Sequence, residues 1–305
     1  MKAWNRFKKS YVLYSFKRDP IAISSFSVLM ALVIISILAP VIAPYNAYDS
    51  ATFDIMDAET PPSWLEGGNE MFKLGTDIQG RDLLSTMIYG LRVSMIIGIG
   101  AVLFQALLGI LVGMFSGFFG GKLDAFLMRI ADIQFSIPYL IVAIFTSAIF
   151  KLAFGVGRYE ELAIPLLIIV IGMSQWPNYA RTVRASVLGE KNKEYVEAAR
   201  VIGINRRQIM FRHILPNTLT PVLVLSTIQV ANAIMSEAAL SFLGLGMPIT
   251  KPSLGSLIRA GFEYIFSGSW WITFFPGVLL VIVILVILLL GDWLRDVLNP
   301  KLYKG

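Results

Sequence analysis

Residues 272–290 run ITFFPGVLLVIVILVILLL, a stretch without a charged side chain. A helix of about 20 predominantly apolar residues matches the hydrocarbon thickness of a bilayer. Over the whole chain of 305 residues, 56% are hydrophobic and 15% are charged, and the mean hydropathy is +0.70. A single soluble core could not cover that much apolar surface. The stretch therefore predicts a transmembrane helix of an integral membrane protein.

Five further segments have the length and composition of membrane spans, so we expect an all-α protein that crosses the bilayer about six times. The first follows six basic residues, but it is longer than a signal peptide and has no persuasive cleavage site, which indicates an uncleaved anchor. The five segments cover residues 21–43, 91–115, 131–150, 163–179 and 219–242.

The distribution of basic residues indicates the orientation. If the N-terminus is cytoplasmic, the inner segments carry 19 of the 26 Lys and Arg residues, and the acidic segment 44–88 falls outside. Cytoplasmic loops of membrane proteins are enriched in Lys and Arg, so both termini are predicted to be cytoplasmic. The expected order is a basic N-terminus (1–20), an anchor helix (21–43), an external loop (44–90), a core (91–291) with a long inner loop (181–216), and a cytoplasmic tail (292–305).

The inner loop 181–216 is longer than the other inner connections, and its residues predict a first short helix. Asn192 is expected to cap this helix, and Gly203 is expected to end it in the left-handed conformation. The helix itself contains Tyr195, Glu197, Ala198 and Ala199.

A second short helix is expected after the glycine. Asn205 and Gln208 have the spacing of a helix cap, and we expect the helix to end before Pro216. The paired alanines after Glu197 leave backbone near the surface, which suits docking into a groove of a partner. An amphipathic helix lying on the membrane surface is the alternative interpretation.

The run Glu197-Ala198-Ala199, followed by Gly203 and Leu215-Pro216, resembles the "EAA" loop of bacterial ABC importer permeases, although His213 replaces the usual aliphatic residue. An external stretch is similar to the signature of the peptide-permease branch, and so are residues 128–132, 240–246 and 291–296. The external stretch includes Gly75, Thr76, Asp77, Gly80, Arg81 and Asp82.

The resemblance implies a type I ABC importer permease fold in the bacterial cytoplasmic (inner) membrane. It implies that the inner loop docks in a cleft of a cytoplasmic ATPase and that the cargo is a di- or oligopeptide. The implied partners are a second homologous permease chain, two cytoplasmic ATP-binding subunits and an external binding protein. ATP and Mg²⁺ would bind those ATPase subunits, and this chain would bind no cofactor.

Polar residues in the fifth span predict a translocation path. Ser226, Gln229, Asn232 and Ser236 recur at helical spacing, and polar groups at membrane depth should face protein or water. They would either offer hydrogen bonds to a passing peptide or join helices within the bundle. Glu237, near the outer end, is expected to act as an external gate or to pair with an Arg such as Arg81 or Arg259.

Other spacings predict contacts between helices. Asp132 lies three residues after Arg129 and is expected to pair with it. Gly109, Gly113 and Gly117 permit close helix approach, either within the chain or against a second subunit. Pro138 and Pro276 are expected either to kink their spans or to be accommodated by neighbouring groups.

The sequence lacks the motifs of enzymes. It has no Cys and one His, so Cys-based metal sites and His clusters are excluded. It has no phosphate-binding G-x-x-x-x-G-K-[ST] loop, no H-E-x-x-H and no G-x-S-x-G. The net charge of +6 is spread along the chain rather than gathered in a nucleic-acid-binding patch. We therefore expect a non-catalytic membrane subunit.

Two alternative functions remain open. The same machine could import another cargo, such as a nickel chelate, haem, an oligosaccharide or an antimicrobial peptide. A secondary transporter would require inverted repeats with paired broken helices, and the sequence shows no clear internal repeat.

Overall fold

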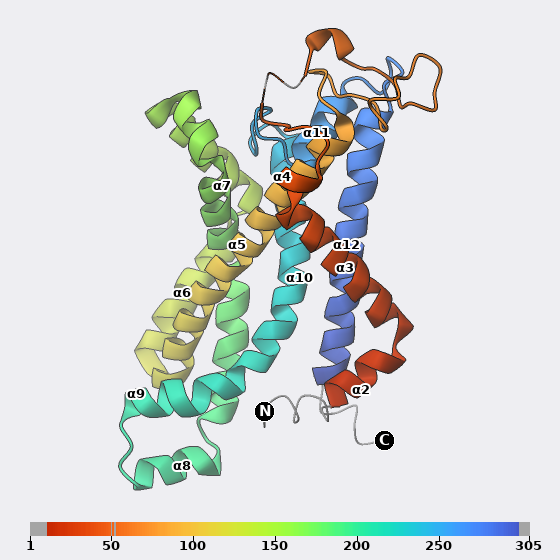
Figure 1. The fold of residues 1–305 in the computed structure, drawn as a ribbon. Helices are drawn as coiled ribbons and strands as arrows, with labels where there is room; N and C mark the ends of the chain where they lie inside the picture. Colours follow the sequence, from red (N-terminus) through yellow and green to blue (C-terminus); the bar gives the residue numbers. More distant parts are fainter. Residues whose placement is uncertain (1–10, 50, 52, 299–305) are drawn as a thin grey trace.

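The computed structural model describes residues 11–49, 51 and 53–298, and these form helices and connecting loops without a β-strand (Figure 1). Residues 1–10 of the expected N-terminal segment and residues 299–305 of the expected tail lie outside this description. The helices are α2 (Tyr11–Arg18), α3 (Pro20–Ile37), α4 (Ala39–Ile42), η2 (Ile55–Asp57), α5 (Leu83–Phe119), α6 (Gly121–Ser136), α7 (Tyr139–Glu190), α8 (Glu194–Val201), α9 (Arg206–Gln208), η3 (Ile209–Ile214), α10 (Leu215–Phe242), α11 (Leu254–Phe262) and α12 (Trp271–Leu298).

Five helices in the described residues are long and apolar enough to cross a membrane, which agrees with an all-α membrane protein. They are α3, α5, α7, the continuous segment Arg206–Phe242, and α12. The first is preceded by Asp19, whose carboxylate accepts hydrogen bonds from the N–H groups of Ile21 and Ala22 at 2.9 and 3.1 Å. Pro20 occupies the first turn, where no N–H is needed.

Helix α7 contains two of the expected crossings because it reverses direction at Gly155. This residue has φ 80° and ψ 163°, outside the helical region. The hydroxyls of Ser147 and Tyr159 both donate to the carbonyl of Leu245, at 3.3 and 2.7 Å. Twelve residues of straight helix would separate these side chains by about 18 Å. The arms 139–154 and 156–190 therefore fold back on each other. If the two arms are counted separately, the described helices include a counterpart for each of the six expected spans.

The helix boundaries differ from the sequence-based expectation where helices extend beyond the apolar runs. Helix α5 begins at Leu83, well before residue 91, because Asp82 caps it by accepting hydrogen bonds from the N–H and hydroxyl of Ser85 at 2.8 and 2.6 Å. Helix α7 continues to Glu190, so the first ten residues of the expected inner loop are helical. The expected span 131–150 is divided at Pro138, whose ψ of 127° separates α6 from α7.

The glycines of α5 pack directly against α7, which places the predicted close approach within this chain. A Cβ atom added to Gly109 would lie 2.2 Å from the Cβ of Tyr179. One added to Gly113 would lie 2.5 Å from the carbonyl oxygen of Ala180. Small residues let helix backbones approach this closely. Helices α5 and α7 therefore share one tightly packed seam.

Figure 1 shows how the ends of the bundle are arranged. Helices α2 and α8 and the C-terminal end of α12 lie at one end, whereas α11 and the loop that precedes α5 lie at the other. Helices α3 and α12 pack beside α5 and α10 through a shared cluster that includes Leu32, Leu91, Ile234 and Val283. The described part of the N-terminal segment thus lies at the same end as the predicted inner loop.

Candidate coupling helix and polar seam

Helix α8 forms where the first short helix was predicted, and a local glycine motif ends it. Gly203 has φ +83°. The N–H of Ile204 donates to the carbonyl of Ala199, and the N–H of Gly203 donates to that of Arg200, each at 3.0 Å. These two bonds define a Schellman motif. The predicted stop at Gly203 is confirmed, whereas the predicted cap Asn192 is wrong, because the N-cap residue is Lys193 and no side chain caps the helix.

The two faces of α8 differ in exposure. Val196 and Ala199 are buried in a cluster with residues of η3. On the other side Glu197 and Ala198 are exposed. Thus only one of the paired alanines lies at the surface, since Ala199 packs beneath the helix.

Two exposed apolar residues follow this face and were not among the residues predicted from the sequence. Val201 is 89% exposed and Ile202 is 77% exposed. Exposed apolar groups rimmed by polar ones mark interaction sites. The sequence signal was available, because both residues stand between the alanine pair and the glycine that ends the helix.

Helix α8 is tied to the helices on both sides. The carboxylate of Glu190, at the end of α7, accepts from the ammonium of Lys193 at 2.5 Å and from the hydroxyl of Tyr195 at 2.6 Å. The amide of Asn217, at the start of α10, donates to the same tyrosine oxygen at 3.1 Å. Partial burial, together with the bond to Glu190, raises the pKa of Tyr195 above its usual value. Tyr195 therefore connects α8 to both α7 and α10.

The second predicted helix begins as expected but does not end before Pro216. Asn205 caps it by accepting a hydrogen bond from the N–H of Gln208 at 2.8 Å. The chain then passes through the π-helical segment Ile209–Ile214 and enters α10 with Pro216 in its first turn. Proline has no N–H to donate to the preceding turn of an α-helix. The wider π-helical turn lies directly before Pro216, so the helix continues through this position. The inner loop is thus continuous with the fifth span.

The polar stripe of α10 is only partly exposed. Asn232 is exposed, Ser226 is half-buried, and Gln229 and Ser236 are buried. The amide of Asn232 donates to the side-chain oxygen of Gln229 at 2.9 Å. The hydroxyl of Ser226 accepts a hydrogen bond from Tyr179 of α7 at 3.1 Å. The stripe therefore includes both helix-joining and surface groups.

Glu237 is fully buried and bonds to serines rather than to arginine. Its carboxylate accepts hydrogen bonds from Ser94 of α5 at 2.9 Å and from Ser241 at 2.6 Å. Ser241 in turn accepts from the N–H of Met247 at 2.9 Å and from the hydroxyl of Ser253 at 3.2 Å. The expected pairing with Arg81 or Arg259 is absent from the described bonds. Glu237 instead joins α5 to the segment between α10 and α11.

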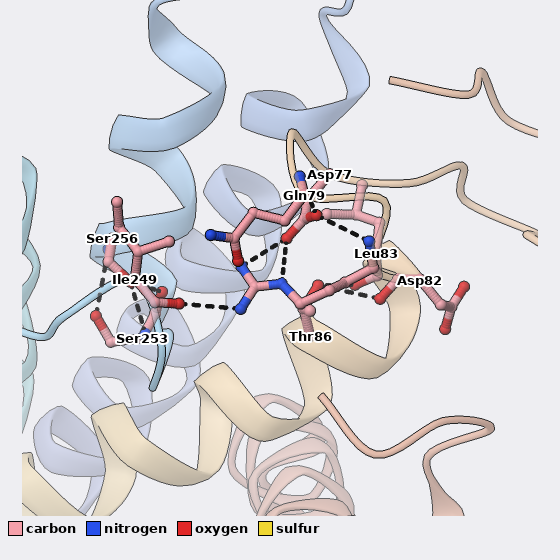
Figure 2. A network of polar contacts seen from close by, with 9 residues as sticks. Asp77, Gln79, Asp82, Leu83, Thr86, Ile249, Ser253 and Ser256 are labelled. Atoms are coloured by element: carbon pink, nitrogen blue, oxygen red, sulfur yellow. Dashed lines mark hydrogen bonds and ion pairs between the residues drawn. The ribbon is translucent and has the colours of Figure 1, made fainter. Parts of the chain in front are cut away.

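Arg81 forms a second link, between the loop before α5 and the segment after α10. Figure 2 shows its two partners, Asp77 and Ile249. Its Nε and Nη2 atoms lie 2.7 and 2.6 Å from the carboxylate of Asp77, and its Nη1 donates to the carbonyl of Ile249 at 2.9 Å. Both members of the ion pair are buried. Removing one partner of such a pair leaves an uncompensated buried charge.

The glycines of this external motif are required by the backbone. Gly75 and Gly80 have φ values of +81° and +78°, which side-chain-bearing residues rarely adopt. A Cβ atom on Gly80 would lie 1.8 Å from the carbonyl oxygen of Asp54.

The other residues of the motif are held by bonds of their own. The carbonyl oxygen of Thr76 accepts a hydrogen bond from the indole N–H of Trp271 at 3.2 Å. Burial raises the pKa of Asp82, the residue that caps α5.

Two acidic residues of α6 pair with arginines of α7. Asp132 lies 2.7 Å from Arg181, so the predicted pairing with Arg129 is wrong, because a neighbouring helix supplies the partner. Asp124 accepts hydrogen bonds from Arg184 at 2.5 and 2.7 Å and from Ser116. The bonds from Arg184 hold the pKa of Asp124 below its usual value of 3.8. These pairs join α6 to α7.

The described residues contain no group of three or more His, Cys, Asp or Glu that could hold a metal ion. Their features are membrane-length helices, a helix with an exposed apolar tip at one end, and polar groups along the packed helices. These features define a multi-span membrane protein with an exposed apolar surface at one end.

Comparisons with known proteins identify the family. Residues 109–304 match the family described as "Binding-protein-dependent transport system inner membrane component". Residues 2–62 match the "N-terminal TM domain of oligopeptide transport permease C". The chain therefore belongs to the family of binding-protein-dependent transport system inner membrane components, which are multi-pass proteins of the bacterial inner membrane.

Several relatives are similar along almost their full length. The di/tripeptide transport system permease protein of Pseudomonas aeruginosa is 37% identical over 94% of this chain and 90% of its own. The oligopeptide transport system permease protein of Bacillus subtilis is 34% identical over 97% and 92%. An inward-facing structure of the MetNI methionine ABC transporter matches 70% of this chain and 97% of its own, with a TM-score of 0.56 and 23% identity. The last similarity concerns the fold.

Proposed function

We propose that this chain is a permease subunit of an ATP-driven ABC importer that takes up di- or oligopeptides delivered by an external binding protein. The family and the peptide-permease relatives support this function. The partners are a second homologous permease chain, two cytoplasmic ATP-binding subunits, which bind ATP and Mg²⁺, and the binding protein. The chain itself supplies part of the path and no catalytic residue.

The observation that carries the proposal is the exposed tip of α8. Val201 and Ile202 are largely exposed although they are apolar, and the side chain of Tyr195 connects α8 to both adjoining helices. A surface of this kind fits a groove on a partner. On this proposal the end of the bundle that holds α8 and α2 is cytoplasmic, in agreement with the excess of basic residues there.

The coupling residues predicted from the sequence have separate roles in this proposal. Glu197 and Ala198 would contact the ATPase directly, because both are exposed. Tyr195 would transmit its movement, and Gly203 and Pro216 would shape the two ends of the loop. Ala199 would support the helix from beneath.

The test uses the complete complex in proteoliposomes. ATP enclosed with the ATPase subunits should drive uptake of a labelled dipeptide, whereas an ion gradient alone should not. The double change Val201→Asp and Ile202→Asp should leave the complex inserted but reduce uptake per ATP hydrolysed at least tenfold. The matched control is Val156→Asp, which changes a residue of the α7 reversal that is 61% exposed at the opposite end. Uptake that persists without ATP would contradict the proposed function, and wild-type coupling in the double variant would contradict the role of α8.

A further inference from the structure

Helix α7 carries an amide pair that matches the one on α10. The side-chain amide of Asn178 donates to the side-chain oxygen of Gln175 at 2.8 Å, as Asn232 donates to Gln229 at 2.9 Å. In both pairs the asparagine follows the glutamine by three residues, so each pair lies on one face of its helix. Gln175 and Asn178 are half-buried, and the sequence analysis did not identify them.

The two pairs lie at the same level of the bundle. Tyr159 bonds to the carbonyl of Leu245 and Tyr179 bonds to Ser226, so α7 and α10 run antiparallel. Gln175 lies four residues before Tyr179, and Gln229 lies three residues after Ser226. Because both helices rise 1.5 Å per residue, the two glutamines stand opposite each other along the α7–α10 contact.

Both pairs also lie on the side of this contact that faces away from α5. On α7, Trp176 and Ala180 adjoin Gly109 of α5, and at 100° per residue Gln175 and Asn178 fall on the other side of Tyr179. On α10, Ile234 packs against Gly98 of α5, whereas Asn232 is exposed and lies about 160° from Ile234 around the helix. The four amides therefore border one face of the helix pair.

This face is unsuited to lipid. Exposed polar groups at membrane depth are costly in hydrocarbon. The exposed face of α5 at the same depth is instead apolar, with Leu103 67% and Leu107 60% exposed.

The groups that remain suit a peptide bond. Within each pair the internal bond uses the amino group of asparagine and the oxygen of glutamine. On α7 an asparagine oxygen and a glutamine amino group are left, which amount to one acceptor and one donor. On α10 the amino group of Gln229 is buried, and the oxygen of the exposed Asn232 is left as an acceptor. A peptide group presents one N–H donor and one carbonyl acceptor in return. We propose, on the basis of the proposed function, that one wall of the translocation path binds the backbone amides of the cargo through Gln175, Asn178 and Asn232, and that Gln229 positions Asn232.

Uncharged amides that bind the backbone discriminate little between side chains. The wall would hold a peptide loosely during passage and tolerate many sequences. It would favour a peptide over its depsipeptide analogue, in which an ester oxygen replaces the N–H. Loss of one neutral hydrogen bond corresponds to roughly a three- to tenfold change.

The test uses the absence of Cys from this chain. Asn178→Cys and Asn232→Cys each introduce a single thiol into the chain, and Leu107→Cys is the control at the same depth. In the complete complex, a membrane-impermeant maleimide should label the first two thiols and leave the third unlabelled. A transported dipeptide should slow labelling roughly three- to tenfold, and its depsipeptide analogue should slow it less.

Several outcomes would overturn the proposal. One is equal labelling at residues 107 and 178, and another is no protection by dipeptide at either asparagine position. Labelling in the isolated chain that disappears in the complex would instead assign this face to the second permease chain. ATP-driven dipeptide uptake is measured in the same membranes, so negative labelling with intact uptake rejects this inference alone, whereas absent uptake rejects the proposed function.

A second variant pair tests recognition without a thiol. Gln175→Met with Asn178→Leu preserves side-chain volume and removes the amides, and Gln134→Met on α6 is the matched control. The double variant should lose the preference for peptide over depsipeptide while keeping ATP hydrolysis. A preference equal to that of the wild type would overturn the proposal.

Discussion

Substitution of Gly109 by Ala tests whether the α5–α7 seam determines the fold. The added Cβ atom would lie 2.2 Å from the Cβ of Tyr179 and 2.7 Å from the carbonyl oxygen of Trp176. Carbon atoms in contact are about 3.5 Å apart, so the helices would have to separate by roughly 1 Å. Neither atom belongs to the free end of a side chain, which means that no rotamer change relieves the clash. Overpacking of this kind costs about 1–3 kcal/mol, and we expect a value near the upper end.

The assay is thermal unfolding in one detergent, followed by tryptophan fluorescence. The matched control is Gly189→Ala, also in the paired helices, where a Cβ atom would meet nothing within 4 Å. Alanine is preferred to glycine inside a helix by about 0.5–1 kcal/mol, so the control should melt at or above the wild-type temperature and Gly109→Ala clearly below it. Equal melting temperatures for the two variants would refute close packing at this seam.

Two further predictions concern charged groups outside the apolar spans. Arg81→Met should destabilise the protein by about 3–5 kcal/mol, because Asp77 is left buried without its partner. In the same unfolding assay, the double variant Arg81→Met with Asp77→Leu should recover most of that loss. A double variant no more stable than the single one would contradict this account. Asp124 has a folded-state pKa below 3.8 because Arg184 bonds to it, so its contribution to stability is present above pH 3.8 and is lost as the pH falls through the folded-state value. Melting temperatures between pH 2 and 6 should fall less steeply at the acid end in Asp124→Asn than in the wild type, and parallel curves would show that the pair does not contribute.

The sequence predicts the features of this molecule that depend on nearby residues. Apolar runs are sufficient for membrane helices because the bilayer sets their length. Gly203 and Asn205 act through bonds that span only a few residues, and both predictions are confirmed. The ends of α5 and α7 are less predictable, since these helices extend into polar sequence once other parts of the chain stabilise them.

Contacts between distant residues could not be predicted in the same way. Arg129 is three residues from Asp132, yet the acid bonds to Arg181, 49 positions away. Similarly, composition identified Glu237 as unusual, but its serine partners come from α5 and from the end of its own helix. Charge and spacing indicate that a buried polar group needs a partner, whereas the packing of the helices decides which partner it has.

The continuity of α10 relates the inner loop to the external motif. Its inner end contacts α8 through Asn217 and Tyr195, and near its outer end Glu237 is bonded to α5 through Ser94. In the glycine seam, α5 and α7 pack so closely that not even a Cβ atom fits between Gly109 or Gly113 and the facing α7 atoms. A force applied at α8 would therefore move α5, α7 and α10 together rather than bend one of them. Under the proposed function, opening and closing of the path would then occur between this three-helix unit and a second permease chain, on the side where the amide pairs lie.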